Sequence, residues 1–429
     1  MVAGMSTPSL WRTPSYLTWL VGDTALGLTR ALVGFAFPLI ALVVTDDPAQ
    51  AGAIGGVGLA VAAFSGIVGG VWADRHSRTR LLVLGALIGA VVAGGFMALA
   101  LADALTFVVL LAIEVVLALR TGVFGMAGEA LLKDIVPSGA IGRAQATNQA
   151  RDAALNLGGG PLGGVLLTVG AWFVGAVLLA CQVIALVTAW LLRRHVPGHA
   201  PVRAEARRSV FAEAREGFAW LFSRSDLRGV LAIITIINLG LSTAITTVIF
   251  SLQQRGFSPT DIGWIAAGAG ASMLAGSLLA PWCVAHVRTG ILAAVGIAAL
   301  AAAVVALPFV DALWPTVALL AGGAFLIPAL NAGMSGYFMV AVPTHLIGRA
   351  SSAASLCTAG AAPLAPVLAG VGLAVFGRLP TLLCAAALCA LAALLAIASR
   401  PLRALPAESG WAAHAERSAP PSVSVTRAD

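Results

Sequence analysis

The sequence predicts an all-α polytopic membrane protein, with twelve transmembrane helices in two pseudo-symmetric six-helix bundles. Three observations support this fold class. Hydrophobic residues make up 59% of the 429 residues and charged residues 10%, which is too little charge to cover a water-soluble surface. The apolar residues gather in long blocks, and about 20 such residues cross a bilayer as a helix. Two sequence repeats divide the chain into related halves.

Twelve apolar blocks account for most of the chain, and short polar turns separate most of them. Backbone groups in lipid must be paired internally, so each block is expected to be a helix. The blocks lie near residues 15–44, 49–72, 81–102, 105–128, 146–170, 172–192, 229–252, 261–284, 290–309, 315–340, 351–376 and 381–399.

The two repeats occur in the same order and at nearly the same offset. The sequence VPSGAIGRA at 136–144 returns as VPTHLIGRA at 342–350, with prolines 206 residues apart. The second repeat is offset by 210 residues, and it pairs Trp72, His76, Arg78 and Thr79 with Trp282, His286, Arg288 and Thr289. Each copy of VPxxxIGRA is expected in the turn between the fourth and fifth helix of its half. Parallel duplicated halves are a plan of secondary transporters.

The distribution of arginine and lysine predicts the orientation in the membrane. Alternate loops carry nearly all of these residues, and the positive-inside rule makes those loops cytoplasmic. Both termini are then cytoplasmic. The net charge of +7 is interpreted as this orientation signal, and nucleic-acid binding is not expected.

These features predict five parts. They are a cytoplasmic N-terminus at 1–14 (Met5 is an alternative start), an N-terminal six-helix bundle at 15–192, a cytoplasmic linker at 193–228, a C-terminal six-helix bundle at 229–400 and a disordered cytoplasmic tail at 401–429. Within the linker, residues 209–222 are amphipathic and are expected to lie on the inner membrane surface.

Several chemistries are excluded by residue type and spacing. The five cysteines and six histidines lack metal-ligand spacing. The only lysine, Lys133, lacks the Gly-Lys-Ser/Thr of a phosphate-binding loop. We therefore expect no metal, no cofactor and no enzymatic activity.

Ionisable residues inside two of the apolar blocks predict a proton-coupling site. Asp23 and Arg30 lie in the first block, and Glu114 and Arg120 lie in the fourth. Such charges cost about 2.5–3.5 kcal/mol each on insertion scales and are usually functional. The helix register allows two ion pairs, Arg30 with Glu114 and Asp23 with Arg120. Structural locks are the alternative interpretation.

The turn after the second block resembles the loop signature of the major facilitator superfamily. The sequence GVWADRHSRTR at 70–80 matches the signature at Gly70, Asp74, Arg75 and Arg78, whereas Ser77 and Thr79 depart from it and Arg80 follows. The resemblance implies that Asp74 stabilises the start of the eleventh helix, because a helix N-terminus favours negative charge. These residues are expected to form a cytoplasmic gate, and the alternative is that the arginines only set orientation.

A second resemblance points to a branch of that superfamily. ALLKDIVP at 130–137, with the glycines and proline of the fifth block, is similar to macrolide-efflux and enterobactin-exporter-like drug:proton antiporters. The antiporter signature is matched imperfectly, since Asn156 and Val165 replace two of its glycines, and plain helix packing is the alternative. The residues of this motif are Asn156, Gly160, Pro161 and Gly164.

The second half offers polar residues in an apolar wall, which suits a hydrophobic or amphiphilic substrate. These residues are Asn238, Ser242, Thr246, Asn331 and Tyr337. We expect a monomeric secondary transporter of a bacterial inner membrane that exports a small drug or natural product in exchange for protons. The alternatives are a uniporter or importer of the same fold and a transport-inactive receptor or scaffold.

Overall fold

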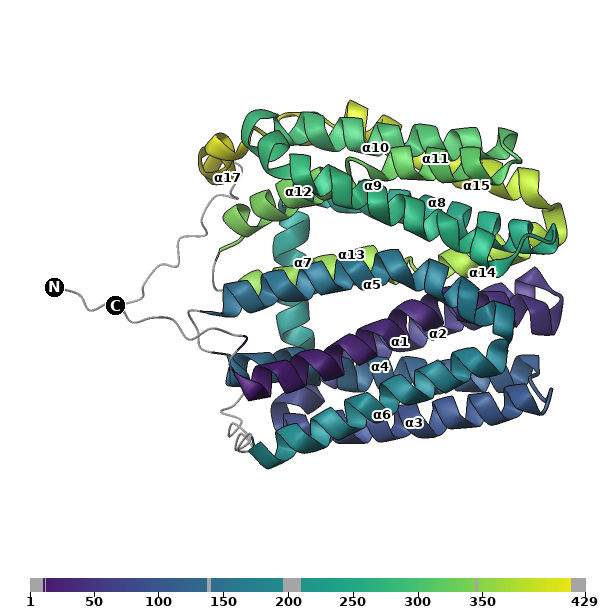
Figure 1. Ribbon diagram of the computed structural model, residues 1–429. Helices are drawn as coiled ribbons and strands as arrows, with labels where there is room; N and C mark the ends of the chain where they lie inside the picture. The colour runs from purple at the N-terminus through teal and green to yellow at the C-terminus, as the bar shows by residue number, and fades with distance from the viewer. Residues whose placement is uncertain (1–10, 12, 137–139, 196–209, 344–345, 418–429) are drawn as a thin grey trace. The chain divides into compact units, whose positions relative to one another are not determined.

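The structure of the protein is a computed structural model, in which Trp11 and residues 13–136, 140–195, 210–343 and 346–417 are described. Nearly all of these residues are helical, and the helices are shown in Figure 1. The helices of the first half are α1 (Pro14–Thr45), α2 (Pro48–Arg75), α3 (Arg78–Leu101), α4 (Phe107–Ile135), α5 (Ile141–Val169) and α6 (Ala171–His195). The linker helix is α7 (Val210–Ser223).

The second half contains more helices than blocks, because two blocks are broken and the tail adds two short helices. Its helices are α8 (Ser225–Gln254), α9 (Pro259–His286), α10 (Thr289–Ala306), α11 (Leu313–Ala324), α12 (Ile327–Ala341), α13 (Ile347–Gly360), α14 (Leu364–Phe376), α15 (Arg378–Ala398), α16 (Arg400–Arg403) and α17 (Trp411–Arg417). Short 3-10 turns, η3 (Leu307–Phe309) and η5 (Glu408–Gly410), follow α10 and precede α17.

Every predicted apolar block coincides with one helix or with two consecutive helices. Ten helical segments of the described chain are long and apolar enough to cross a membrane. Helix α5 is not among them, and it carries Arg143, Arg151, Asp152 and Asn156 together with several glycines. The eleventh block divides into α13 and α14 at residues 361–363, where Pro363 removes a backbone donor. The all-α polytopic fold is confirmed.

The turns lie where the repeats predicted them. Helix α4 ends at Ile135 and α5 begins at Ile141, while α12 ends at Ala341 and α13 begins at Ile347. Both copies of VPxxxIGRA therefore join the fourth and fifth segments of their halves. Residues 137–139 and 344–345 within them lie outside the described residues.

The chain divides into two compact units that do not coincide with the two sequence halves. The first unit contains residues 1–204, 246–270 and 366–377, and the second contains the remainder. In the first unit α2 packs against α4, α3 against α6, and α1 against both α5 and α6. Its core includes Leu32, Phe37, Phe96 and Leu110, all buried among α1, α3 and α4.

The first unit gains segments of the second half through backbone contacts at glycines. A Cβ on Gly52 of α2 would overlap the carbonyl oxygen of Pro366, and a Cβ on Gly370 of α14 would overlap that of Pro48. In the same way, a Cβ on Gly263 of α9 would lie 2.8 Å from the carbonyl oxygen of Gly160. Small residues permit such close helix approach. Three segments of the second half therefore pack on the first half. They are the end of α8, the start of α9 and helix α14.

The linker contains the expected amphipathic helix, which packs on its own unit. Arg349 of α13 donates to Glu216 of α7 at 2.8 Å. Trp220 packs against Val342 and Leu346 in the second copy of VPxxxIGRA. Whether this helix also lies on the membrane surface stays a prediction.

The tail differs from its expected disorder. Residues 400–417 form α16, η5 and α17, whereas residues 418–429 lie outside the described residues. Trp411 is buried and its indole Nε1 donates to Thr289 Oγ1 at 2.9 Å. The backbone N–H of Thr289 donates to the carbonyl oxygen of Pro406 at 3.1 Å. Composition does not predict this docking, because the docking depends on one tryptophan and a few leucines in an otherwise polar tail.

Candidate functional site

The carboxylate of Asp23 on α1 pairs with an arginine that was not predicted. Its Oδ2 lies 2.6 Å from Arg151 Nη2 of α5, and the two side chains are 21% and 11% exposed. The same guanidinium lies 2.9 Å from Asp152 Oδ1 and 5.9 Å from the ring of Trp19. The predicted pair of Asp23 with Arg120 is therefore wrong. The partner comes from α5 and not from α4.

Arg151 and Asp152 are the site residues that the sequence interpretation missed. They lie near the start of the fifth block at 146–170, ahead of its glycine motif. Two consecutive ionisable residues in a weakly hydrophobic stretch are the signal that could have identified them. Such residues need polar partners inside a spanning helix.

The second predicted pair, Arg30 with Glu114, is also wrong. No ion pair joins these side chains, both of which belong to the described part of the chain. Arg30 is exposed. A Cβ on Gly27 would lie 3.8 Å from Arg30 Nη2 and 3.9 Å from Asp152 Oδ1, so both groups lie beside this glycine. Arg30 therefore lies toward α5. Similar depth in the membrane does not bring two side chains together, because the direction of each side chain decides the contact.

Glu114 of α4 lies against α2. A Cβ on Gly58 would overlap the carboxylate of Glu114, so the glycine makes room for it. Glu114 Oε2 is buried and has no hydrogen-bond partner among the described residues. An unsatisfied buried carboxylate oxygen is costly, so Glu114 is an unusual group inside an apolar helix.

Arg120 of α4 points into the interior of the first unit. Its Nε donates to the carbonyl oxygen of Gly85 at 2.7 Å, and its Nη2 donates to Gln182 Oε1 of α6 at 3.0 Å. Gln182 Nε2 donates in turn to Thr29 Oγ1 of α1 at 3.3 Å. These bonds join α1, α3, α4 and α6.

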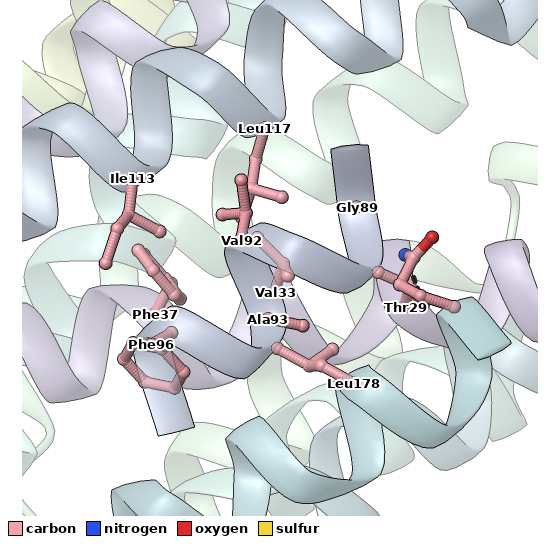
Figure 2. Close-up of a pocket in the computed structure, with 11 residues that line it drawn as sticks. Thr29, Val33, Phe37, Gly89, Val92, Ala93, Phe96, Ile113, Leu117 and Leu178 are labelled. Carbon is pink, nitrogen blue, oxygen red and sulfur yellow. Dashed lines mark hydrogen bonds between the residues drawn. The ribbon is translucent and has the colours of Figure 1, made fainter. Parts of the chain in front are cut away.

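Two small cavities adjoin these polar groups. The first has a volume of about 10 Å³ and is shown in Figure 2. Thr29 lies at its polar end and Phe37 and Phe96 at its apolar end (Figure 2). The second has a volume of about 20 Å³ and is lined by Asp23, Trp19 and Thr188 among others. Each is large enough for about one water molecule.

The predicted gate residues are only partly described. Arg78 Nη1 lies 2.6 Å from Asp134 Oδ2 and donates to the carbonyl oxygen of Ala130 at 2.9 Å. It therefore joins α3 to α4 within the first unit. Arg80 is exposed. Gly70, Asp74 and Arg75 lie in α2, but their side chains fall outside the described part of the structure.

The glycine motif of α5 is a packing surface in this structure. Gly160 faces Gly263 and Ala266 of α9, and a Cβ on Gly164 would lie 2.5 Å from the carbonyl oxygen of Pro259. Pro161 lies inside the helix, and Asn156 is exposed. The motif thus brings α5 into backbone contact with α9.

The polar residues predicted for the second half are not gathered at one described site. Asn238, Ser242 and Asn331 are exposed, and Thr246 is half-buried. Tyr337 is completely buried, and Arg224 Nη2 donates to its Oη at 3.4 Å. Its ring also contacts His414 of the tail at 5.9 Å between centroids. Tyr337 therefore packs under the tail in this structure, and its role as a cavity residue stays a prediction.

The described histidine, cysteine and acidic side chains are dispersed. No group of three or more histidine, cysteine or acidic side chains there could hold a metal ion. The five cysteines are free thiols.

Comparisons with known proteins agree with this architecture. The sequence profile of the Major Facilitator Superfamily matches residues 20–366. A search of curated protein sequences found no significant match. Among solved structures, a bacterial homologue of the iron transporter ferroportin, in an inward-facing state, has a TM-score of 0.70 and 16% identity, and the alignment covers 91% of this chain and 99% of that one.

A mutant of the nucleoside transporter NupG has a TM-score of 0.66 and 14% identity, with coverage of 89% and 99%. At these identities the structural matches establish the fold alone. The sequence profile spans most of the chain, and this protein belongs to the major facilitator superfamily.

Proposed function

We propose that the protein is a proton-coupled exporter of a small hydrophobic or amphiphilic compound, working by alternating access in a bacterial inner membrane. The observation that supports this best is the pair of half-buried carboxylates in the first unit. Asp23 is held by Arg151, and Glu114 has an unsatisfied oxygen against α2. Two such groups inside apolar helices are costly, and in membrane proteins they are commonly proton relays.

The Asp23–Arg151 pair offers a mechanism for coupling. Protonation removes the charge of Asp23 and with it the attraction that holds α1 to α5 at this point. Arg151 then retains Asp152, whose side chain is 46% exposed. Uptake of one proton would therefore change how α1 and α5 pack. A change of this kind is what alternating access needs from its coupling ion.

The glycine contacts of the first unit supply the second part of the proposal. They join α2 to α14 and α5 to α9 by backbone packing. In addition, Gln253 Nε2 of α8 donates to the carbonyl oxygen of Leu39 at 2.8 Å. These are contacts between segments from both sequence halves. We propose that they close one side of the membrane and separate in the opposite state.

The gate and the substrate surface complete the proposal. Asp74 and Arg75, with Gly70 and Arg80, would close the cytoplasmic side, while Arg78 acts locally on Asp134. The exposed polar residues of the second half, Asn238, Ser242 and Asn331, would contribute to an otherwise apolar substrate surface. The working unit would be a monomer with both termini in the cytoplasm.

Transport in proteoliposomes tests this function. Purified protein is reconstituted with pyranine inside the vesicles, and an imposed pH gradient drives the accumulation of amphiphilic fluorophores such as ethidium. We expect uptake against the concentration gradient together with proton counter-flow. Asp23→Asn and Glu114→Gln should each reduce proton-driven accumulation by about tenfold or more, while downhill exchange persists. The expected size follows because a gradient of one pH unit supplies about 1.4 kcal/mol per proton, which is a factor of about ten in substrate concentration.

Asp311→Asn is the matched control. This carboxylate also pairs with an arginine, Arg378, at 2.9 Å, but it is 76% exposed in a turn. It should leave accumulation unchanged. If both bundle variants concentrate the fluorophore as well as the unmodified protein does, proton coupling through these residues is wrong. Transport that only equilibrates the substrate would identify a uniporter, and binding without transport would identify a receptor.

A further inference from the structure

The guanidinium of Arg120 is held by neutral acceptors only. Its hydrogen-bond acceptors are the carbonyl oxygen of Gly85 and the side-chain amide oxygen of Gln182. No carboxylate lies within ion-pair distance of it in the described part of the chain. Arg120 is half-buried, and a cation withdrawn from water normally has an anionic partner. The position of this charge therefore depends on the groups that hold it.

Gln182 is placed to fix that position. It is 1% exposed, and its two amide atoms act in opposite directions, accepting from Arg120 and donating to Thr29. Thr29 Oγ1 then donates to the carbonyl oxygen of Ala25 at 3.0 Å. All three donors point the same way along this chain, which strengthens each bond.

The neighbouring helix is shaped around these two side chains. A Cβ on Gly89 of α3 would overlap Gln182 Oε1 and would lie 2.9 Å from Arg120 Nε. Only glycine at this position leaves room for both groups. The first cavity adjoins Thr29, Gly89 and Gln182, and Figure 2 shows its apolar wall on the other side. The packing around both groups therefore leaves Gln182 as the side chain that sets where the guanidinium of Arg120 lies.

The ionisable groups around Arg120 are few. On α1 they are Asp23 and Arg30, on α5 Arg151 and Asp152, and on α4 itself Glu114, which precedes Arg120 by six residues or about 9 Å of helix. Helix α6 adds the thiol of the buried Cys181. Residues 48–66 of α2 and 81–101 of α3 contain no ionisable side chain.

We propose that Gln182 is a positioning residue that holds Arg120 against α3 and α6, away from Asp23 and Glu114. This inference rests on the proposed function, because those carboxylates are the proposed proton sites. A positive charge that comes closer favours the ionised carboxylate. By restraining Arg120, Gln182 keeps the carboxylates able to take up protons at the working pH.

The test is the pH dependence of proton-driven transport in Gln182→Leu. Leucine has a similar size but cannot accept from Arg120, so the arginine is released. The midpoint of the pH profile should move to lower pH by about one unit, equivalent to about a tenfold change in proton affinity. Gln182→Glu retains an acceptor for Arg120 and adds negative charge, so its midpoint should stay or move to higher pH.

Two further variants separate this effect from general destabilisation. Thr29→Val removes the acceptor of the Gln182 amide N–H. The midpoint of the pH profile should then shift in the same direction as in Gln182→Leu, but by less. Gln50→Leu is the matched control, since the Gln50 amide donates to Asp47 at 3.2 Å near the start of α2. It should not move the midpoint. A lower maximal rate with an unchanged midpoint in Gln182→Leu, or a shift to higher pH, would overturn the inference.

Infrared titration of the carboxyl C=O bands, assigned with Asp23→Asn and Glu114→Gln, measures protonation without transport. If transport is not driven by protons but Gln182→Leu still moves this titration to lower pH, the proposed function fails and the positioning role stands. If transport is driven by protons and the titration does not move, the positioning role fails.

Discussion

Arg78 and Arg288 occupy the same place in the two copies of the second repeat, at the start of α3 and just before α10. Arg78 contacts Asp134 of α4 at 2.6 Å. The position 206 residues after Asp134 is Val340, so the second half lacks this acid. Arg288 instead donates to the carbonyl oxygen of Arg403 in the tail at 3.3 Å. One repeat thus uses a side-chain acceptor where the other uses the backbone of a distant segment.

This difference predicts that Asp134 stabilises the first unit locally. Asp134→Asn should lower the free energy of unfolding by about 1–3 kcal/mol, because it leaves the half-buried Arg78 with a weaker acceptor. A double-mutant cycle with Arg78→Gln, measured by thermal unfolding in detergent, should show coupling between the two sites. Val340→Asn, at the equivalent place in the second half, is the control and should show no coupling with Arg78→Gln. Additive effects of Asp134→Asn and Arg78→Gln would contradict a direct pair.

At the scale of secondary-structure elements, the tail and the linker helix meet around one arginine. Arg224, which follows α7, is 2% exposed and its Nη1 donates to the carbonyl oxygen of Ala415 in α17 at 3.3 Å. Its Nη2 contacts Tyr337 of α12. Trp411 packs against Gly336 of α12, where a Cβ would lie 2.6 Å from the indole. The tail is thus a structural element of the second unit.

Trp411→Ala should detach this element. Truncation of a buried tryptophan costs about 3–5 kcal/mol, which is more than a short docked segment is expected to withstand. In inside-out membrane vesicles, trypsin should then cut after Arg403 several times faster than in the unmodified protein. Trp282→Ala is the control, because Trp282 is 61% exposed. Equal cleavage rates in the two variants would show that Trp411 does not hold the tail.

The elements were predictable where one physical signal dominated. Hydrophobic blocks predicted the spanning segments, because apolar residues strongly favour lipid and charged residues strongly favour water. The repeats predicted the turns after α4 and α12. The partner of Asp23 was not predictable, because α1 contacts α4, α5 and α6 and several arginines lie at similar depths. The tail was missed because its docking depends on Trp411 and on Gly336, which are 75 residues apart in the sequence. Periodicity reports which face of a helix is buried, but it does not report the neighbour.

At the scale of the whole molecule, sequence halves and compact units do not coincide. The first unit includes α14 and the adjoining ends of α8 and α9, all from the second half. The chain crosses between units inside α8 and α9 and at the start of α14, where Pro363 interrupts the helix. A protein that alternates between two states must exchange such contacts without breaking its helices. Backbone packing at glycines suits that exchange, because few side chains need to rearrange.

Gly52 offers a direct test of this exchange. Valine at this position would overlap the carbonyl oxygen of Pro366 and should disfavour the present state by about 1–3 kcal/mol, or roughly 5–150-fold in population. A cysteine introduced at Ala51, which is 1% exposed, would then react faster with a membrane-impermeant maleimide added to intact cells. Gly66→Val on the same helix is the control, since a Cβ there meets nothing within 4 Å. Slower transport without faster labelling would mean that Gly52→Val damages the packing of α2 alone, and the α2–α14 contact would then be a fixed part of the fold and not a gate.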